Sequence, residues 1–266
     1  MVKAISLPSA VIVALRAWIS SIALILFVIL TKRKIDRETF KSYVLPMSMC
    51  GIFMAIDWIG LFEAYNYTTV AISTVCYYMQ PIMVVIGSAL LLKEKFTIKH
   101  VICAITAFIG MFFVSGVLSG KAPTVAELKG IGFALLGAVS YAAIVLTNKK
   151  NPQGDPVVKT AIQLFVAAIL TTPYILLSYD VTTLSIDLKG IILLLILGIF
   201  ITAIPYIIFF NTITKIPART VAIFSYADPV VAVLLSIFVM GEPMTVFGLI
   251  GSVLIIGAAL VSELKN

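Results

Sequence analysis

The sequence predicts an all-α membrane protein, a polytopic bundle of nine transmembrane helices built as an inverted-topology repeat of four plus five helices. Two observations predict this class. Apolar residues make up 61% of the chain and charged residues only 12%, about half the charged fraction of an average soluble domain. In addition, short polar motifs inside apolar stretches recur at a fixed offset of 148 residues, a pattern typical of duplicated membrane bundles.

Nine apolar runs are long enough to cross a bilayer, because about 20 residues rising about 1.5 Å each span the hydrocarbon core. The linkers between the runs are short, which leaves no room for a soluble domain. A backbone in lipid must satisfy its own hydrogen bonds, so we expect helices and not open strands. The runs are 7–30, 43–65, 70–92, 98–118, 130–147, 157–177, 190–213, 221–241 and 246–261.

The repeat is clearest where polar residues interrupt the apolar runs. Residues 78–81 read Tyr-Met-Gln-Pro, and residues 226–229 read Tyr-Ala-Asp-Pro. A glutamate follows thirteen positions after each proline, at Glu94 and Glu242, and we expect both to contact nearby loops and helix ends. The matching positions further upstream are Trp58 and Tyr206.

The two copies are predicted to span 1–120, with four helices, and 121–266, with five. The alternation of spans places Glu94 on the cytoplasmic side and Glu242 on the extracellular side, so the copies have opposite orientations. A symmetrical bundle of five plus five helices needs one more helix before Met1. Either the true start of the protein lies upstream, or the protein works with nine helices.

The net charge of +7 is distributed unevenly over the linkers. Fourteen lysines and arginines lie in or beside alternate linkers and in the C-terminal tail, whereas the opposite side holds four. The positive-inside rule makes the first side cytoplasmic, with the C-terminus inside a multi-pass protein of the cell (inner) membrane. This placement argues against a nucleic-acid partner. The expected partners are the lipid bilayer and a small-molecule substrate, and the expected assembly is a monomer or a homodimer.

No residue pattern indicates an enzyme, a cofactor or a metal site. The three cysteines lie within apolar runs without metal-ligand spacing, where thiols behave as small apolar groups. The only histidine, His100, lies at the start of a run and is expected at the membrane interface. No glycine-rich phosphate loop with a following lysine indicates an ATP-driven motor. Asp57 and Asp228 lack the Gly-x-Gly-Asp context of intramembrane aspartyl proteases.

The stretch WIGLFEAYNYTTVAIS from Trp58 to Ser73, followed by Pro81 and by Lys93-Glu94-Lys95, resembles the first copy of an EamA-like transporter of the drug/metabolite transporter superfamily. The stretch from Ala222 to Pro229, followed by Gly241-Glu242-Pro243, resembles the second copy. The resemblance implies ten helices with both termini in the cytoplasm, of which the first is absent here. It also implies export or uptake of small metabolites, amino acids or drugs through a central cavity between the two halves.

Charged side chains inside lipid are rare, because each costs about 3 kcal/mol near the bilayer centre. Arg16 and Asp57 each lie about eight residues from the outer end of neighbouring runs, roughly 12 Å below the outer surface, so we expect a buried ion pair. Two interpretations stay open: Arg16 anchors a substrate carboxylate while Asp57 holds it, or the pair only neutralises both charges. Glu63 lies near the outer interface, where we expect it to reach water.

Asp228 lies about a third of the way across its run, next to Pro229. Proline removes a backbone hydrogen bond and kinks a helix, so Pro81 and Pro229 are the expected bend points. One interpretation makes Asp228 a substrate contact or a proton-carrying carboxylate. The other bonds it to a freed backbone group or to a neighbouring tyrosine. Gln80 holds the matching place in the first copy and cannot titrate.

Aromatic residues surround these positions. Tyr78 and Tyr226 are two residues from Gln80 and Asp228, about 200° around a regular helix, so only a kink brings each pair to one cavity. Trp58 begins an aromatic stripe, which either stacks on a ring-bearing substrate or serves as packing or as an interfacial belt. Further hydrogen-bonding candidates are Tyr77, Tyr141, Tyr206 and Asn211.

These observations together predict a secondary transporter that moves small metabolites, such as amino acids, drugs or related solutes, by alternating access. Proton coupling through Asp228 is one mechanism. The alternatives are an uncoupled facilitator of the same solutes and a non-transporting membrane scaffold or sensor. The lack of a soluble docking domain in the sequence argues against the scaffold.

Overall fold

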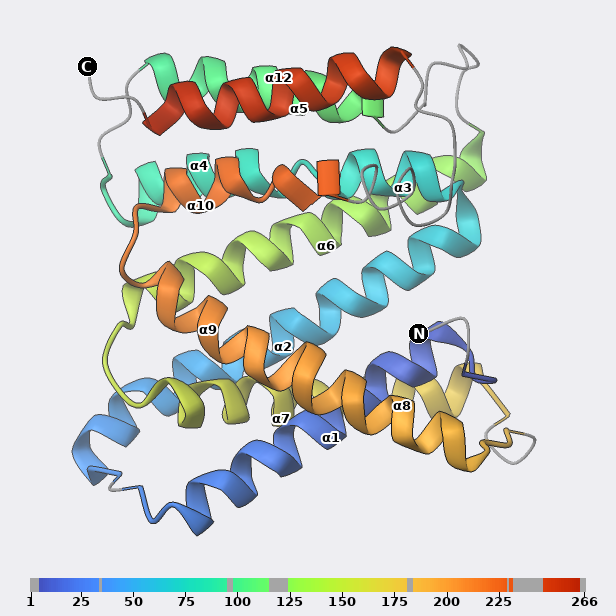
Figure 1. The fold of residues 1–266 in the computed structure, drawn as a ribbon, viewed down its shortest axis with the longest axis vertical. Coiled ribbons are helices and arrows are strands. Elements are labelled where there is room, and N and C mark those ends of the chain that lie inside the picture. The colour runs from blue at the N-terminus through green and yellow to red at the C-terminus, as the bar shows by residue number, and fades with distance from the viewer. Residues whose placement is uncertain are drawn as a thin grey trace. The chain divides into compact units, whose positions relative to one another are not determined.

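A computed structural model describes residues 5–33, 35–94, 98–114, 124–180, 184–228, 230–231 and 246–263. All regular secondary structure in these ranges is helical (Figure 1), which confirms the predicted all-α class. The elements are α1 (Ser9–Leu30), α2 (Arg37–Tyr67), α3 (Val70–Tyr77), α4 (Gln80–Leu91), α5 (Ile98–Val114), α6 (Val125–Lys150), α7 (Pro156–Ser178), α8 (Leu188–Gly198), η3 (Ile199–Ala203), α9 (Ile204–Ile213), α10 (Ala218–Phe224) and α12 (Val246–Glu263).

Six helical stretches of the described chain are long and apolar enough to cross a membrane. They are Ser9–Leu30, Arg37–Tyr67, Ile72–Leu91, Val125–Lys150, Pro156–Ser178 and Leu188–Ile213. Two shorter apolar helices, Ile98–Phe113 and Val246–Ala258, coincide with two further predicted runs. The helical membrane bundle is therefore confirmed. The number nine stays a prediction, because run 221–241 is described only in part.

The chain divides into two compact units, and each unit is discontinuous in sequence. Unit 1 comprises 1–59 and 147–215, and unit 2 comprises 60–146 and 216–266. Helix α2 passes from unit 1 to unit 2 after Ile59, and α6 returns after Leu146. These units do not coincide with the predicted repeats, because each unit takes helices from both halves of the sequence. The repeat boundaries stay a prediction.

Three of the helix pairs that are related by the 148-residue offset lie within one unit, and the fourth begins in one unit, since only the first part of α2 lies in unit 1 with α8 and α9. Adding 148 to the bounds of α1 gives 157–178, which matches α7, and adding it to α5 gives 246–262, which matches α12. In the same way α2 matches α8 to α9, and α3 matches α10. In unit 1, α1 packs against α7, and in unit 2, α5 packs against α12 along much of their length (Figure 1). Each unit thus pairs elements with their counterparts.

Small residues and hydrogen bonds hold unit 1 together. A Cβ atom at Gly198 would lie 2.5 Å from Cγ2 of Ile19, so glycine allows α1 and α8 to approach closely. At the same contact the Ser20 hydroxyl donates to the Gly198 carbonyl at 2.7 Å. The Trp18 indole donates to the Thr172 hydroxyl at 2.9 Å, which joins α1 to α7. In lipid the hydrophobic effect does not drive helices together, so close packing and hydrogen bonds of this kind hold them in contact.

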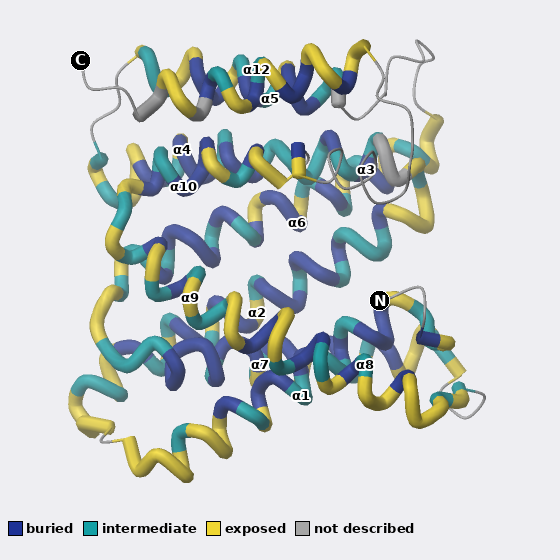
Figure 2. Tube along the Cα trace, viewed as in Figure 1, coloured by how far each residue is buried: buried dark blue, intermediate teal, exposed yellow. Residues whose placement is uncertain are grey.

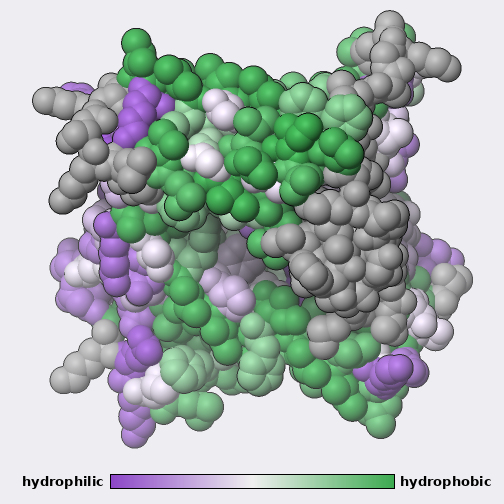
Figure 3. Space-filling view, turned by 45° about the horizontal axis from the view of Figure 1, so that its top comes forward, coloured by the Kyte–Doolittle hydropathy of each residue, from purple (hydrophilic) through white to green (hydrophobic). Residues whose placement is uncertain are grey.

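The core of unit 2 lies between α5, α12 and the segment around α10. Its buried residues are Val75, Cys103, Ala107, Met111, Ile223, Tyr226, Val230, Ile255 and Ala258. Buried and exposed residues alternate around α5 and α12 (Figure 2). The exposed side of this helix pair is almost wholly apolar (Figure 3), as it would be against acyl chains. The core and the outer surface of unit 2 are therefore both hydrophobic, which is characteristic of a helix pair in lipid.

Prolines interrupt two of the long spans. Pro81 lies in the first turn of α4, after a turn at Tyr78 and Met79 that ends α3. Since proline clashes with the carbonyl four residues earlier, the interruption falls at this turn, ahead of Pro81 itself. Pro205 likewise follows the π-helical turn η3, where the Thr202 hydroxyl donates to the Leu197 carbonyl at 2.8 Å. Such π turns accommodate a missing backbone donor inside a helix.

A turn at Ser225 and Tyr226 interrupts the second copy in the same way, two residues before Asp228. Pro229, the second predicted bend point, lies outside the described residues. Both copies therefore have a turn at the tyrosine that precedes the Gln80 or Asp228 position. The role of Pro81 and Pro229 as bend points during transport stays a prediction.

We expect Gly110→Ala to destabilise unit 2. A Cβ atom at Gly110 would lie 2.7 Å from the Gly251 carbonyl oxygen on α12, and relieving such overpacking costs about 1–3 kcal/mol. Thermal unfolding of the purified protein in detergent should show a clear fall in the melting temperature. The matched control is Gly132→Ala, because a Cβ atom there meets nothing within 4 Å. Equal melting temperatures for the two variants would contradict the α5–α12 packing.

Candidate functional site

Unit 1 holds a cluster of Arg16 from α1, Asp57 and Trp58 from α2, and Tyr206 from α9, here called the arginine cluster. The Arg16 Cζ atom lies 5.7 Å from the centroid of the Trp58 ring. The Trp58 indole donates a hydrogen bond to the Tyr206 hydroxyl, which also lies within electrostatic reach of both Arg16 and Asp57. Asp57 and Trp58 are 5% and 8% exposed. Four polar groups from three helices thus meet in an apolar unit.

The arginine cluster can bind an acceptor. The guanidinium of Arg16 stacks on an electron-rich ring, a favourable cation–π arrangement. Its Nε atom is buried and has no hydrogen-bond partner in the described part of the chain. A carboxylate would supply the missing acceptor. The direct Arg16–Asp57 ion pair stays a prediction, and the structure adds that both charges share Tyr206 as a neighbour.

Asn211 lies on the same helix as Tyr206. The two residues are five positions apart on α9, about 140° around a regular helix. Their side chains therefore leave different faces, and Asn211 is not brought to the arginine cluster by the helix that carries it. Its role in substrate binding stays a prediction without a supporting contact.

Unit 2 holds a second cluster, here called the tyrosine cluster, made of Tyr65, Tyr78, Tyr141, Tyr226 and Asp228. The rings of Tyr78 and Tyr226 stack, with centroids 6.3 Å apart and an interplanar angle of 24°. Asp228 is close enough to Tyr78 to act on its hydroxyl through charge, as are Tyr65 and Tyr141. The turns at Tyr78 and Tyr226 make this stack possible, because each frees its tyrosine from the regular helical direction.

Two polar groups next to this stack lack partners. Gln80 is 4% exposed and Tyr226 is 0% exposed. The Oε1 atom of Gln80 and the hydroxyl of Tyr226 have no hydrogen-bond partner among the described residues. An unsatisfied buried polar group costs about 1–3 kcal/mol, so native proteins keep few of them without a ligand or water. Asp228 itself is exposed on the surface of unit 2.

A buried amide network in unit 1 was not foreseen from the sequence. The Asn148 Nδ2 atom donates to Gln163 Oε1 at 3.0 Å, and Gln163 Nε2 donates to Asn148 Oδ1 at 3.3 Å. Asn148 also contacts Cys50 Sγ at 3.4 Å, and buried Lys159 donates to the Asn151 carbonyl. Because its donors and acceptors are paired with one another, this network joins α2, α6 and α7 as a structural element. The only signal in the sequence is two neutral amides inside or beside apolar runs.

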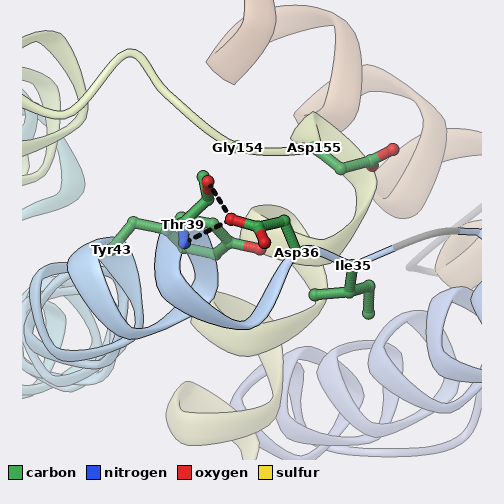
Figure 4. A pocket seen from close by; sticks show the side chains of 6 residues that line it. All are labelled: Ile35, Asp36, Thr39, Tyr43, Gly154 and Asp155. Carbon is green, nitrogen blue, oxygen red and sulfur yellow. Dashed lines mark hydrogen bonds between the residues drawn. The ribbon is translucent and has the colours of Figure 1, made fainter.

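A small pocket of about 140 Å³ lies among the linkers of unit 1 (Figure 4). The Asp36 carboxylate accepts from the Thr39 hydroxyl at 2.6 Å and from its backbone N–H at 2.8 Å. Nearby, Asp155 caps α7 and forms an ion pair with Arg33. Ligand pockets usually measure about 300–1,000 Å³, so this pocket is too small for a metabolite.

Glu94 contacts a helix end, as expected from the sequence. Its two carboxylate oxygens each lie 3.1 Å from the backbone N–H of Ala218, the first residue of α10. Glu242, its counterpart, lies outside the described residues. Within the described chain, no group of three or more histidine, cysteine, aspartate or glutamate side chains is arranged to hold a metal ion.

The amide network predicts non-additive stability changes. Gln163→Leu should lower the free energy of unfolding by about 1–3 kcal/mol, because it removes the amide that hydrogen-bonds to buried Asn148. Asn148→Leu should do the same, whereas the double variant should lose less than the sum. Detergent thermal unfolding of the four proteins measures this cycle. Additive losses would show that the two amides do not depend on each other.

The Asp36 cap predicts a pH dependence. The hydrogen bonds from the Thr39 hydroxyl and backbone hold the pKa of Asp36 below its ordinary value. A carboxyl with a lowered folded pKa stabilises the protein above its unfolded pKa, about 3.9, and this contribution is lost as the pH falls through the folded pKa. The melting-temperature gap between wild type and Asp36→Ala should therefore narrow on acidification. Glu38→Ala, on the same exposed turn, is the control for general charge effects.

Comparisons with known proteins match this architecture. The model of the EamA-like transporter family matches residues 1–116 and again residues 128–263. A solved crystal structure of a protein aligns with a TM-score of 0.83 at 20% identity, covering 97% of this chain and 90% of that one, which shows the shared fold.

Two curated relatives are also transporters by name. The uncharacterized transporter YxxF of Bacillus subtilis is 26% identical over 81% of this chain and 68% of its own length. An uncharacterized transporter of Archaeoglobus fulgidus is 29% identical over 92% of this chain and 85% of its own. Because the family model covers most of the sequence in two matches, the assignment does not depend on any one relative. The chain belongs to the EamA-like transporter family.

Proposed function

We propose that this membrane transporter is a secondary carrier of small metabolites, such as amino acids, drugs or related solutes, that works by alternating access. The observation that carries the proposal is the pair of buried, unpartnered groups at Gln80 and Tyr226. Gln80 directly follows the turn at Tyr78 and Met79, and Tyr226 lies in the matching turn, two residues before Asp228. Interrupted helices with free polar groups are where carriers bind their substrates.

Contacts between repeat-related residues support an inverted repeat. Trp58 and Tyr206 differ by 148 positions and are hydrogen-bonded in unit 1. Tyr78 and Tyr226 differ by 148 positions and are stacked in unit 2. In a duplicated structure a residue touches its own counterpart only beside the local twofold axis that relates the copies. We infer that both polar clusters lie beside such local axes, the usual place for a carrier's substrate site.

The two clusters have different proposed roles. Asp228 is the proposed proton-carrying carboxylate. Its counterpart, Gln80, cannot titrate, so proton coupling would depend on one copy of the repeat. The arginine cluster is proposed to hold a substrate carboxylate on Arg16, with Asp57 orienting the guanidinium. The distribution of lysine and arginine supports a multi-pass protein of the cell membrane with a cytoplasmic C-terminus.

We expect the purified protein to transport solutes in proteoliposomes. Vesicles preloaded with a defined mixture of proteinogenic amino acids, organic amines, and organic acids and alcohols that lack an amine would be analysed by mass spectrometry for losses that depend on the protein. Asp228→Asn should lower the initial rate at least about tenfold, the scale of one charge-assisted interaction. Glu63→Gln removes the same charge elsewhere in unit 2 and should leave the rate within about twofold.

The same vesicles separate the alternatives. Coupled transport predicts that an imposed pH gradient drives accumulation in wild type but not in Asp228→Asn. Uncoupled facilitation predicts equilibration without accumulation in both proteins. Absence of flux for every solute in the mixture, from folded and correctly inserted protein, would instead favour a scaffold.

A further inference from the structure

We infer that the tyrosine cluster recognises the ammonium group of an organic amine, an inference that rests on the proposed transport function. Together with Gln80, which follows Tyr78 by two residues, the cluster presents hydrogen-bond acceptors and aromatic faces, and its formal charge is negative. Each of these three properties favours a ligand that carries donors and one positive charge.

The unpartnered atoms are acceptors or can act as acceptors. Gln80 Oε1 is a carbonyl oxygen and can only accept a hydrogen bond, so only a donor can satisfy it. The Tyr226 hydroxyl can accept as well as donate. The Asp228 carboxylate, two residues after Tyr226, accepts only. An ammonium group brings up to three donors, whereas a carboxylate ligand would leave Gln80 unsatisfied and be repelled by Asp228.

The aromatic rings add to the same preference. Tyr78 stacks on Tyr226, and Tyr77 meets Tyr78 edge-on with centroids 6.2 Å apart. The face of a tyrosine ring carries partial negative charge and attracts ammonium ions, the more so where water is excluded. An aromatic ring on the amine could also stack on these tyrosine rings. The cluster therefore favours an amine that bears an aromatic group.

The charges of unit 2 fit a monovalent cation. The described lysines and arginines of this unit are Lys93, Lys99, Lys129 and Arg219. They lie in a linker or in the first two turns of a helix, and the one nearest to the cluster along the chain, Arg219, is seven positions before Tyr226. Because Gln80 is the neutral counterpart of Asp228, the two copies together supply one negative charge. A single ammonium group balances it.

Binding of three matched probes to the purified full-length protein tests the inference. The probes are 2-phenylethylamine, its neutral analogue 2-phenylethanol and the anion 3-phenylpropionate, measured by isothermal titration calorimetry in detergent. We expect the amine to bind at least about tenfold more tightly than the alcohol, the scale of a charged hydrogen bond. The anion should bind more weakly than the alcohol. This comparison uses only wild-type protein, so it does not depend on whether a variant folds.

Variants then locate the binding. Asp228→Asn should remove the advantage of the amine over the alcohol, and Gln80→Leu should reduce it. Glu63→Gln, which removes a carboxylate outside the cluster, should retain it. Equal binding of amine and alcohol by wild type would overturn the inference, as would an unchanged advantage in Asp228→Asn.

The transport assay keeps the two proposals apart. If vesicles show Asp228-dependent flux of solutes that lack an amine, the carrier function stands and the ammonium preference is wrong. If the amine binds at Asp228 but no solute in the mixture crosses the vesicle membrane, the ammonium inference stands as a binding property and the carrier function fails.

Discussion

The structure depends on one constraint: a chain in lipid has no water to complete its backbone hydrogen bonds, so every interruption of a helix must be satisfied by the protein itself. In unit 2 the interruptions fall at Tyr78 and at Tyr226, and their rings stack on each other. In unit 1 the interruption before Pro205 is taken up by a π turn. Tyr206 of the arginine cluster directly follows Pro205, and Tyr78 and Tyr226 of the tyrosine cluster lie at the turns themselves.

The predicted duplication accounts for polar residues that occur in related pairs, and the members of each pair are not identical. Two pairs of helices that match at the 148-residue offset, α1 with α7 and α5 with α12, pack directly within their units. Where a residue meets its own counterpart, the two copies have been free to diverge in chemistry. Trp58 faces Tyr206, and Gln80 is the counterpart of Asp228. As a result the tyrosine cluster is asymmetrical and contains one carboxylate, Asp228.

The apolar surface and the polar interior have opposite consequences for stability. Exposed leucines, isoleucines and valines on α5 and α12 gain nothing from mutual contact in lipid, so close approach at Gly110 and hydrogen bonds such as Asn148–Gln163 carry the packing. Paired groups of this kind stabilise the unit. The unpartnered atoms at Gln80 and Tyr226 have the opposite effect, and a fold retains such a cost most readily where a ligand offsets it.

The sequence alone determined the helical class, the repeat offset and the identity of most charged candidates, because long apolar runs and charges within them are properties of local composition. Arg16, Asp57 and Asp228 were recognisable as candidates for that reason. Tertiary structure decided which of them meet: Tyr206 with Trp58, Tyr78 with Tyr226, and Glu94 with the start of α10. It also decided the Asn148–Gln163 pair. Those contacts depend on how the helices pack and where they turn. Hydrophobic periodicity in the sequence shows which face of a helix is apolar, but it does not show which other helix that face will contact.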